Sequence, residues 1–427
     1  MLSRLQYSDP ESANRFNQML ESRRNPVSRV NVRNIVEDIR QNGDTALVDY
    51  TARFDGVTLA PEDLRIDPKE IASAVIDRQT TQAMERAIQR IEAFHCHEPG
   101  NDWWTVSADG ALLGQRFLPI DSVGVYIPGG SAPYASSLLM NVIPARIAGV
   151  SRIVAVTPPG VEGAIDPAIL VAARLCGIDE IYRVGGAQAI ASLAYGTASI
   201  PSVAKIVGPG NAYVAEAKRL VYGDVGIDTI AGPSEVVILA DASANPRLIA
   251  ADLIAQAEHD DDALVLLVTT SEPLVAEIRD EIERQLVSLD RVTTIRAALE
   301  TSVALLAETM PLAIQQANAI APEHLQLFVH DPLEIVPKIQ TAGVILCGPF
   351  SPAAICDYGI GPNHVLPTGG TGRFASALGV QDFLRRISVI HASKSSFGSV
   401  AADGIALANI EGLTGHAAAL EIRLEDS

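Results

Sequence analysis

Short apolar runs alternate with longer amphipathic segments along the middle of the chain. The runs at 151–159 (SRIVAVTPP), 235–241 (EVVILAD) and 263–270 (ALVLLVTT) have the length and composition of buried strands. Each run is followed by a stretch with helical spacing of its apolar positions. Strands that alternate with helices form βαβ units around a parallel sheet. The alternation occurs once before and once after the segment AGPSE at 231–235, which predicts two successive modules.

The remaining segments are mostly helical in pattern. Helical periodicity predicts helices at 1–20, 32–95 and 303–317 and in the last residues, 378–427. We expect the helix at 303–317 to break near Pro311, because a proline inside a helix removes a hydrogen bond. The segment 113–128 instead predicts β-structure that runs into a glycine turn.

The predicted fold is therefore α/β, with two Rossmann-like doubly wound parallel-sheet modules and helical N- and C-terminal arms. The predicted domains are an N-terminal helical arm at 1–21, a main α/β domain formed by 22–125 and 236–377, a second Rossmann-like domain at 126–235, and a C-terminal helical arm at 378–427.

Composition narrows the class of protein. Of the 427 residues, 48% are apolar and 19% are charged, which is typical of a globular α/β enzyme. The net charge of −19 argues against nucleic acid and anionic membrane as partners. The four cysteines form no C-x-x-C pair, which favours reduced thiols. There is no apolar leader-like segment near the N-terminus and no apolar run of membrane-spanning length, so we expect a soluble cytoplasmic protein.

Glycine turns follow three predicted strands, at Gly129-Gly130, Gly185-Gly186 and Gly208-Pro209-Gly210-Asn211. Such a turn leaves backbone amides free and presents a helix N-terminus to an anion. The last turn lacks the third glycine of the dinucleotide fingerprint, because Tyr213 stands there, so a plain tight turn is an open alternative. The three turns together predict a nucleotide crevice without deciding which nucleotide binds.

Residue types that bind metals occur in three further stretches. Gln256 and His259 are three residues apart, so their Cβ atoms lie about 5–6 Å apart on one helix face. The alternative is an imidazole favoured by a helix C-terminus. Asp357 follows a predicted strand, where open α/β sheets place their sites, and His416 lies on the last helix, five residues after Glu411. Two imidazoles, a carboxylate and an amide oxygen suit zinc better than calcium or magnesium.

An acidic residue and a histidine are adjacent at 323–324, just before the predicted strand LQLFV. Glu323 and His324 can act as two proton acceptors of different pKa. The alternative is a pair of solvated polar residues in a loop.

Several of these stretches together resemble the histidinol dehydrogenase family, in order from about residue 20 to 420. The stretches that carry the resemblance are GVYIPGG (124–130), VGGAQAIASLAYGT (184–197), KIVGPGNAYVAEAKRLVYGDVGIDTIAGPSE (205–235), LIAQAEHD (253–260), APEHLQL (321–327), DYGIGPNHVLPTGGTGRF (357–374) and EGLTGHA (411–417).

The resemblance implies a zinc- and NAD-dependent four-electron dehydrogenase that oxidises L-histidinol to L-histidine through the aldehyde, as a homodimer with a shared site. The implied zinc ligands are Gln256, His259, Asp357 and, from the partner subunit, His416. The implied substrate-binding residues are Ser234, His324 and Glu411 together with these ligands, with His364 close by. The implied NAD contacts are Tyr126, Gln188 and Asn211. His324 would be the base for each hydride transfer, and Glu323 would activate water.

Two positions depart from the family pattern, and two other functions stay open. Cys356 stands where glycine is expected, and Ala135 stands where proline is usual. One alternative is a related zinc- and NAD-dependent enzyme that oxidises another alcohol, such as sulfopropanediol. The other is a zinc hydrolase in which Glu323 activates water and no cofactor binds.

Overall fold

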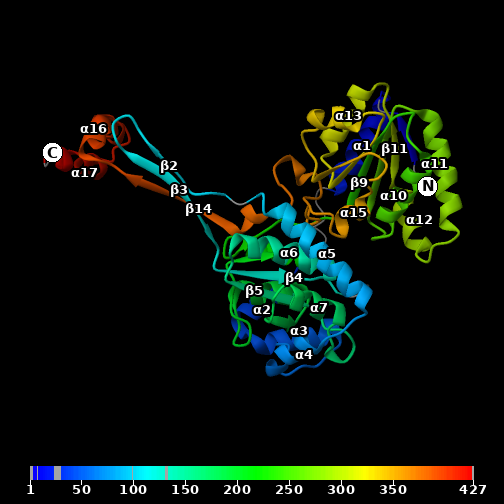
Figure 1. The fold of residues 1–427 in the computed structure, drawn as a ribbon, viewed down its shortest axis with the longest axis horizontal. Helices are drawn as coiled ribbons and strands as arrows, with labels where there is room; N and C mark the ends of the chain where they lie inside the picture. Colours follow the sequence, from blue (N-terminus) through cyan, green and yellow to red (C-terminus); the bar gives the residue numbers. More distant parts are fainter. Residues whose placement is uncertain (1–2, 7, 24–29, 99, 130–132, 426–427) are drawn as a thin grey trace.

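The protein consists of two α/β units and a long arm (Figure 1). The computed structural model describes residues 3–6, 8–23, 30–98, 100–129 and 133–425. One unit contains β9 (Glu235–Ala240), the other contains β4 (Ser122–Tyr126), and the arm ends in α16 (Lys394–Ile410) and α17 (Thr414–Glu425). Each unit is built around an all-parallel sheet, which confirms the predicted α/β fold with two doubly wound modules.

The first unit has a six-stranded sheet. Its order is β1 (Ser3–Gln6), β11 (Val303–Leu306), β10 (Leu264–Thr269), β9, β12 (His324–Phe328) and β13 (Val344–Cys347). Its helices are α1 (Pro10–Arg23), α10 (Pro246–Ala257), α11 (Glu272–Leu286), α12 (Val292–Thr301), α13 (Met310–Ile320), α14 (Pro332–Ile335) and α15 (Ala353–Asp357). Successive side chains of a strand point to opposite faces. Val236 of β9 packs with α10, α11 and α12, and Val237 packs with α1 and α13. Burial on both faces explains the unbroken apolar run of β9.

The second unit has a five-stranded sheet. Its order is β6 (Ile181–Arg183), β5 (Arg152–Thr157), β4, β7 (Lys205–Val207) and β8 (Gly226–Ile227). One face carries α4 (Pro68–Ser73), α5 (Arg78–His95), α6 (Ala135–Ala148) and α7 (Pro167–Leu175); the other carries α2 (Arg33–Asn42), α3 (Asp44–Asp55), α8 (Gly186–Tyr195) and α9 (Ala212–Val221). None of the helices in the described part of the chain is long and apolar enough to cross a membrane.

The helices of residues 33–95 pack against the five-stranded sheet. The predicted domain division instead joins 22–125 to 236–377, which would place these helices with the six-stranded sheet. In the structure, Ile39 of α2 and Ile91 of α5 are buried on opposite faces of the five-stranded sheet. A parallel sheet needs cover on both faces, and these helices supply the part that the crossover helices of this sheet leave open.

Two predicted helical segments contain strands. Residues 303–306 form β11, which pairs with β10 on one side and with β1 on the other. The predicted helix over 303–306 is therefore wrong, because pairing on both sides outweighs the local helical pattern. Pro311 instead lies in the first turn of α13, where its missing N–H has no intrahelical partner to lose. The N-terminal segment also supplies a strand, β1, before α1 buries Phe16 in the core.

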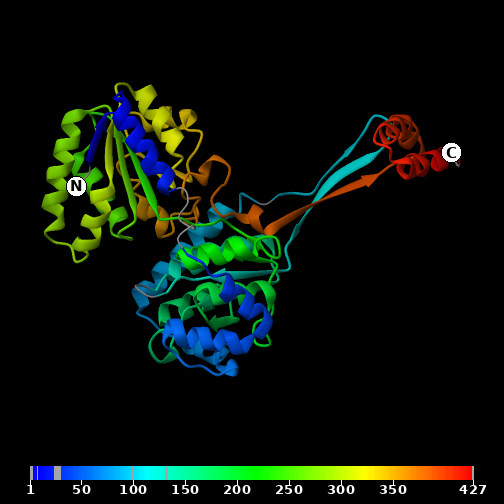
Figure 2. The ribbon, with the colours of Figure 1, turned by 180° about the vertical axis from the view of Figure 1, so that it is seen from behind.

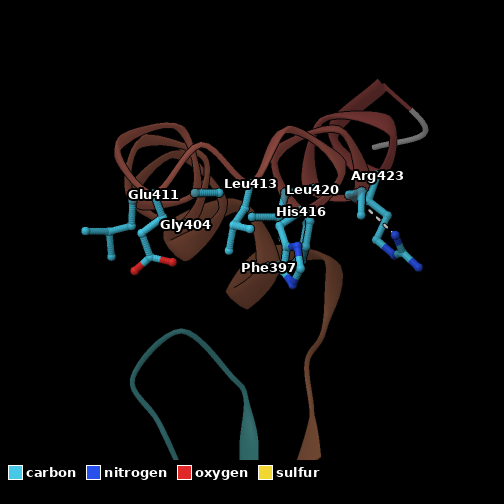
Figure 3. Close-up of a pocket in the computed structure, with 10 residues that line it drawn as sticks. Phe397, Gly404, Glu411, Leu413, His416, Leu420 and Arg423 are labelled. Carbon is cyan, nitrogen blue, oxygen red and sulfur yellow. Dashed lines mark hydrogen bonds between the residues drawn. The ribbon is translucent and has the colours of Figure 1, made fainter.

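The arm projects away from both units, with the C-terminus at its far end (Figures 1 and 2). Its stem is an antiparallel sheet of β14 (Leu384–His391), β3 (Leu112–Pro119) and β2 (Trp103–Val106). The segment 378–427 was predicted to be helical, and β14 corrects this prediction. At the tip, α16 and α17 pack against each other (Figure 3). The base is anchored to the second unit, since Lys205 donates a 2.7 Å hydrogen bond to the carbonyl oxygen of Asp382.

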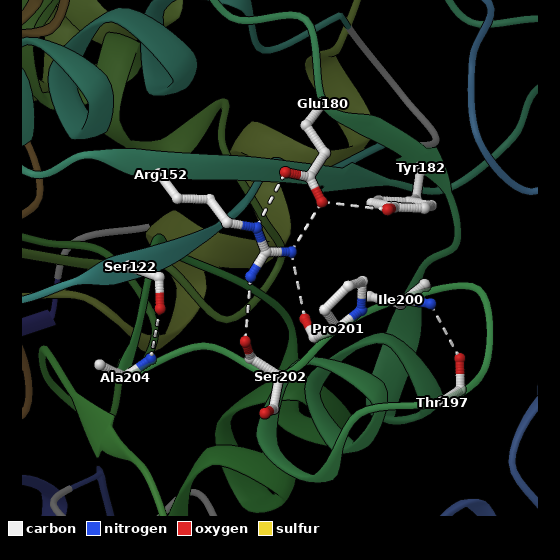
Figure 4. Close-up of polar contacts among 9 residues, drawn as sticks. All are labelled: Ser122, Arg152, Glu180, Tyr182, Thr197, Ile200, Pro201, Ser202 and Ala204. Atoms are coloured by element: carbon white, nitrogen blue, oxygen red, sulfur yellow. Dashed lines mark hydrogen bonds and ion pairs between the residues drawn. The ribbon is translucent and has the colours of Figure 1, made fainter.

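A polar network ties the amino edge of the five-stranded sheet (Figure 4). Arg152, the first residue of β5, donates from Nε at 2.9 Å and Nη2 at 2.6 Å to the two carboxylate oxygens of Glu180. The guanidinium also donates to the carbonyl oxygens of Pro201 and Ser202, and the Tyr182 hydroxyl donates to Glu180. Protein groups therefore satisfy one another at this edge, and the glycine turns lie at the opposite, carboxyl edge.

Candidate active site

The glycine turns meet at the carboxyl edge of the five-stranded sheet. A Cβ atom on Gly129, after β4, would lie 2.8 Å from Cγ of Pro158, and one on Gly185, after β6, would lie 2.6 Å from Cβ of the same proline. A Cβ atom on Gly208, after β7, would lie 2.2 Å from the carbonyl oxygen of Tyr126. Glycine is therefore required at these positions because neighbouring turns approach one another closely.

The structure brings the three predicted NAD contacts to this edge. Tyr126 ends β4, and its hydroxyl accepts a 3.1 Å hydrogen bond from the amide of Gly186. Gln188 lies in the first turn of α8 and is almost fully buried. The side-chain oxygen of Asn211 accepts hydrogen bonds from two amides in the first turn of α9. Gly130, the second glycine of the first predicted turn, lies outside the described residues.

A buried ion pair holds the turn after β7. The side chains of Lys218 and Asp228 are each 2% exposed and pair with one another. Lys218 Nζ donates to the carbonyl oxygen of Gly208 at 3.0 Å, and the Gly208 amide donates to Asp228 Oδ2 at 2.7 Å. Both backbone groups of Gly208, whose φ is +111°, are thus bound to the pair. Lys218 and Asp228 therefore set the shape of the turn.

The predicted acid–base pair lies at the start of β12. His324 Nδ1 is 3.2 Å from the carbonyl oxygen of Glu235 and 3.6 Å from Glu323 Oε2. Glu323 Oε2 also accepts a 2.7 Å hydrogen bond from the Glu235 amide. His324 Nε2 is buried without a hydrogen-bond partner among the described residues, 3.9 Å from Asp357 Oδ1. In the neutral imidazole, donation from Nδ1 to the Glu235 carbonyl would leave Nε2 as a free acceptor.

The two histidines of this cluster, buried His324 and half-buried His364, have opposite pKa shifts. Burial lowers the pKa of His324, but the nearby carboxylates of Glu323 and Asp357 outweigh burial and raise the pKa to about 9. Burial lowers the pKa of His364, although Asp357 acts in the other direction. His364 therefore favours its neutral form, whereas His324 takes up a proton readily as long as both carboxylates are charged.

The end of α10 carries the predicted amide and imidazole ligands. One terminal atom of the Gln256 amide is buried and has no hydrogen-bond partner among the described residues. His259 is exposed, and its Nδ1 lies 3.2 Å from the Gln256 carbonyl oxygen. This contact would leave Nε2 of a neutral imidazole available to an ion. Helix α10 contacts α15, which ends at Asp357.

These side chains fit a zinc site by their chemistry but do not complete one. Amide oxygen, imidazole and carboxylate are suitable zinc donors. Within the described ranges, however, no three His, Cys, Asp or Glu side chains come close enough together to hold a metal ion.

The two departures from the family pattern are both buried. Cys356 is 1% exposed and packs with Leu346 and Ala353. Burial raises the pKa of the Cys356 thiol to about 12, so it stays protonated and is a poor metal ligand. Ala135 begins α6 and lies in the core of the second unit.

The cluster of Glu323, His324 and Asp357 lies at the amino edge of the six-stranded sheet. His324 begins β12, and Ser234 directly precedes β9, where its carbonyl oxygen accepts the amide of Leu264 at 3.0 Å. The expectation that Asp357 marks the carboxyl ends of the strands is wrong. After β13 the chain turns back through α15, so that Asp357 reaches His324 at the beginning of β12.

The loop from 357 to 365 joins the two units. His364 Nδ1 lies 2.9 Å from the carbonyl oxygen of Asp357. Next to it, Asn363 donates a 2.6 Å hydrogen bond to the carbonyl oxygen of Met140 in α6. Gly359, with φ of +87°, packs directly on α5. The same loop thus contacts the acid–base cluster and two helices of the second unit.

Glu411 and His416 are far from the other predicted site residues of the same chain. Glu411 caps α16 and His416 lies in α17, at the tip of the arm (Figures 1 and 3). In Figure 3 their side chains project from the same side of the helix pair. They line a hollow of about 470 Å³ with apolar neighbours that include Phe397, Leu407 and Leu420. The chain therefore does not bring these two residues to its own cluster.

Several polar residues of the site were missed by the sequence analysis. Gln326, in the centre of β12, donates a 2.5 Å hydrogen bond to Asp252 of α10, and burial raises the pKa of Asp252 to about 6. Lys218 and Asp228 are ten residues apart on different elements. None of these pairs has a local spacing that distinguishes it from surface polar residues.

The fold and the clusters define an α/β protein built from two parallel-sheet units, with converging glycine turns on one unit and a buried acid–base pair on the other. The family model for histidinol dehydrogenase matches residues 20–424. Relatives named histidinol dehydrogenase from Synechococcus sp. and Halalkalibacterium halodurans are each 48% identical, covering 92% of this chain and 91% and 93% of theirs. The crystal structure of histidinol dehydrogenase from Elizabethkingia anophelis matches with a TM-score of 0.89 and 37% identity over 93% of both chains. The chain belongs to the histidinol dehydrogenase family.

The buried pair at Gly208 generates a prediction about stability. Asp228→Asn should lower the free energy of unfolding by about 3–5 kcal/mol, because it leaves the Lys218 ammonium buried without a charged partner. Urea unfolding followed by circular dichroism measures the change. Glu283→Gln, which breaks an exposed ion pair with Arg296, is the matched control and should change little. Equal effects of the two substitutions would contradict the assigned role of Asp228.

Proposed function

We propose that the protein oxidises L-histidinol to L-histidine through L-histidinaldehyde, with zinc as cofactor and two NAD reduced, as the last steps of histidine biosynthesis in the cytoplasm. The observation that carries the proposal is the buried Nε2 of His324, 3.9 Å from the Asp357 carboxylate, in a chain of the histidinol dehydrogenase family. An acceptor held in this way beside a carboxylate suits removal of a hydroxyl proton.

The chemistry balances as two hydride transfers. In the first, the alcohol would give a hydride to NAD and its hydroxyl proton to Nε2 of His324, leaving the aldehyde. His324 would then release this proton to solvent. Glu323 would take a proton from water as the water adds to the aldehyde, and would return it to the former aldehyde oxygen to give the gem-diol. The gem-diol would give a second hydride to a second NAD and a hydroxyl proton to His324, leaving the carboxylic acid. Glu323 is suited to this role because the Glu235 amide donates a hydrogen bond that fixes its Oε2. This oxygen lies 3.6 Å from Nδ1 of His324.

Gln256, His259 and Asp357 would hold the zinc ion, together with His416 of a second copy. When bound, zinc would orient the substrate and polarise its hydroxyl, and its redox inertness leaves the electrons to NAD. Positive charge at Asp357 would also offset one of the two carboxylates that raise the pKa of His324. His324 would then be a free base closer to neutral pH.

The carboxyl edge of the five-stranded sheet would bind NAD, with Tyr126, Gln188 and Asn211 as contacts. Support comes from the converging glycine turns and from the helix N-termini of α8 and α9, which follow two of these turns at this edge. Helix α6 follows the Gly129 turn and also accepts the hydrogen bond of Asn363. This contact would set the dinucleotide side against the substrate side.

The substrate would be held by Ser234, His324 and Glu411 together with the zinc ligands, with His364 close by. Burial lowers the pKa of His364, which favours its neutral form. Glu411 and His416 reach no such cluster within one chain. A homodimer in which each arm extends to the other subunit would supply them, and the exposed apolar side chains of Leu407, Ile410 and Leu413 on the arm favour such an interface.

The protein has two alternative functions to test against this proposal. A related enzyme acting on another alcohol, such as sulfopropanediol, would use the same acid–base pair with a different substrate pocket. A zinc hydrolase would use Glu323 and no dinucleotide, and the glycine-turn crevice argues against it.

The reaction itself is tested by stoichiometry. Purified enzyme with L-histidinol and excess NAD should form two NADH for each histidinol consumed. Chelation should abolish turnover and added zinc should restore it, because the site needs its metal. Absorbance at the NADH band and chromatography of histidine measure both products. Turnover of sulfopropanediol without turnover of L-histidinol would refute the substrate; release of a hydrolysis product without NADH would refute the reaction.

The role of Glu323 is tested by Glu323→Gln. The amide oxygen can still accept the Glu235 amide, so the fold should be preserved. We expect the aldehyde-to-acid half to slow about 100-fold or more, since general base catalysis is worth that much, and the alcohol-to-aldehyde half to slow far less. Single-turnover NADH formation from histidinol and from the aldehyde separates the halves, with Glu334→Gln, an exposed acid on α14, as control. Equal slowing of both halves would sink the assignment.

The shared site is tested by complementation. His259→Ala and His416→Ala homodimers should each be inactive and poor in zinc. Co-refolded in equal amounts, they should recover about a quarter of the wild-type activity, because half of the dimers are mixed and each mixed dimer has one intact site. Activity and zinc content of the mixture measure the recovery. A mixture as inactive as its parents would indicate that His416 serves its own chain or is no ligand.

A further inference from the structure

Asp55 is an acidic residue at the carboxyl edge of the five-stranded sheet. It is the last residue of α3, and Gly56 follows in the left-handed conformation with φ of +71°. Helix α3 contacts α8, and the Asp55 carboxylate lies 3.5 Å from the side-chain nitrogen of Gln188 in the first turn of α8. Asp55 therefore lies beside a proposed NAD contact although it comes from a distant part of the chain.

The position is unfavourable for a carboxylate. Asp55 is half-buried, and burial raises its pKa to about 6. It ends a helix, where the helix dipole repels negative charge. No cationic side chain pairs with it in the described part of the chain; Arg53, two residues earlier, lies over the ring of Phe54. An uncompensated charge at such a place is typical of a residue kept for binding and not for stability.

The neighbours of Asp55 are neutral groups at the same edge of the sheet. The Tyr126 hydroxyl accepts the Gly186 amide at 3.1 Å. Burial, with a smaller contribution from the Asp55 charge, raises the pKa of Tyr126 to about 12, so the hydroxyl stays protonated. This edge thus combines the Tyr126 hydroxyl, the Gln188 amide and the Asp55 carboxylate, and Asp55 is the only one of these three side chains that can carry a negative charge at neutral pH.

We propose that Asp55 accepts hydrogen bonds from the 2′- and 3′-hydroxyls of the adenosine ribose and thereby makes the enzyme select NAD over NADP. The inference rests on the proposed binding of NAD at this edge. A carboxylate accepts from a pair of adjacent hydroxyls, as acidic residues do in dinucleotide-binding folds. It repels a 2′-phosphate strongly, because Asp55 is partly desolvated and no cationic side chain among the described residues pairs with it.

The test compares coenzymes in wild type, Asp55→Asn and Asp49→Asn. Asp49 is an exposed acid on the same helix, so its substitution changes the net charge equally without touching the crevice. Wild type should prefer NAD in kcat/KM. Asp55→Asn should lower kcat/KM for NAD by about 10-fold or more, through KM, because it removes a charged hydrogen-bond acceptor. The preference for NAD over NADP should narrow by about 10-fold or more, whereas Asp49→Asn should keep the wild-type preference.

Thermal unfolding separates binding from a structural role. If Asp55 is kept for the coenzyme, Asp55→Asn should leave Tm unchanged or raise it, since an unfavourable charge is removed. The inference would be overturned if Asp55→Asn lowered Tm and reduced kcat/KM equally for both coenzymes, or if it left the coenzyme preference unchanged. In either case, NAD turnover by wild type would still support the proposed function. If wild type reduces no NAD with L-histidinol, the proposed function fails; titration calorimetry with NAD and NADP then decides the inference, and binding without a difference between wild type and Asp55→Asn, or no binding, overturns it.

Discussion

The hydrogen bond from Asn363 to the Met140 carbonyl, 2.6 Å long and buried, is the constraint on which the rest of the site depends. It fixes the loop from 357 to 365 on the second unit, while the other end of the loop places Asp357 beside His324 on the first unit. Gly359 and Gly361 allow this loop to approach α5 closely, where a Cβ on Gly359 would lie 2.8 Å from Ala87. Movement of one unit against the other would therefore displace the Asp357 carboxylate, because the loop is held on both units.

A second constraint is electrostatic. Glu323, His324 and Asp357 are packed into a largely buried cluster, in which two carboxylates raise the pKa of one imidazole to about 9. Such a group holds its proton at neutral pH and would be a poor base. The arrangement makes chemical sense if Asp357 shares its charge with a cation, and the unpartnered amide atom of Gln256 at the end of α10 is consistent with the same ion. The zinc ion of the proposed function would supply this cation.

Much of the fold was predictable because it is locally encoded. Runs such as EVVILAD and ALVLLVTT are buried on both faces, and their length and turns mark them as parallel strands. The strand at 303–306 and strand β14 were missed because pairing with distant segments, and not local pattern, decides their structure. Among the residues of the described clusters, Gln188, Glu323 and Asp357 stand in short motifs that can be singled out from the sequence. Asp55 and Lys218 instead lie beside partners that adjacent sequence does not reveal. The amino-edge location of the cluster also required the structure, since the return of the chain through α15 is a tertiary feature.

The arm has a large consequence for function. This consequence cannot be seen in one chain alone. The base of the arm is hydrogen-bonded to the second unit through Lys205 and Asp382. The tip of the arm nevertheless holds Glu411 and His416 far from the other predicted site residues (Figures 1 and 2). A free arm with exposed Ile410 and Leu413 would be costly in water. If a second copy buries that surface and receives His416 into its own cluster, association and completion of the metal site become one event. The stability of the dimer and the affinity for the metal would then be linked, each strengthened by the other through mass action.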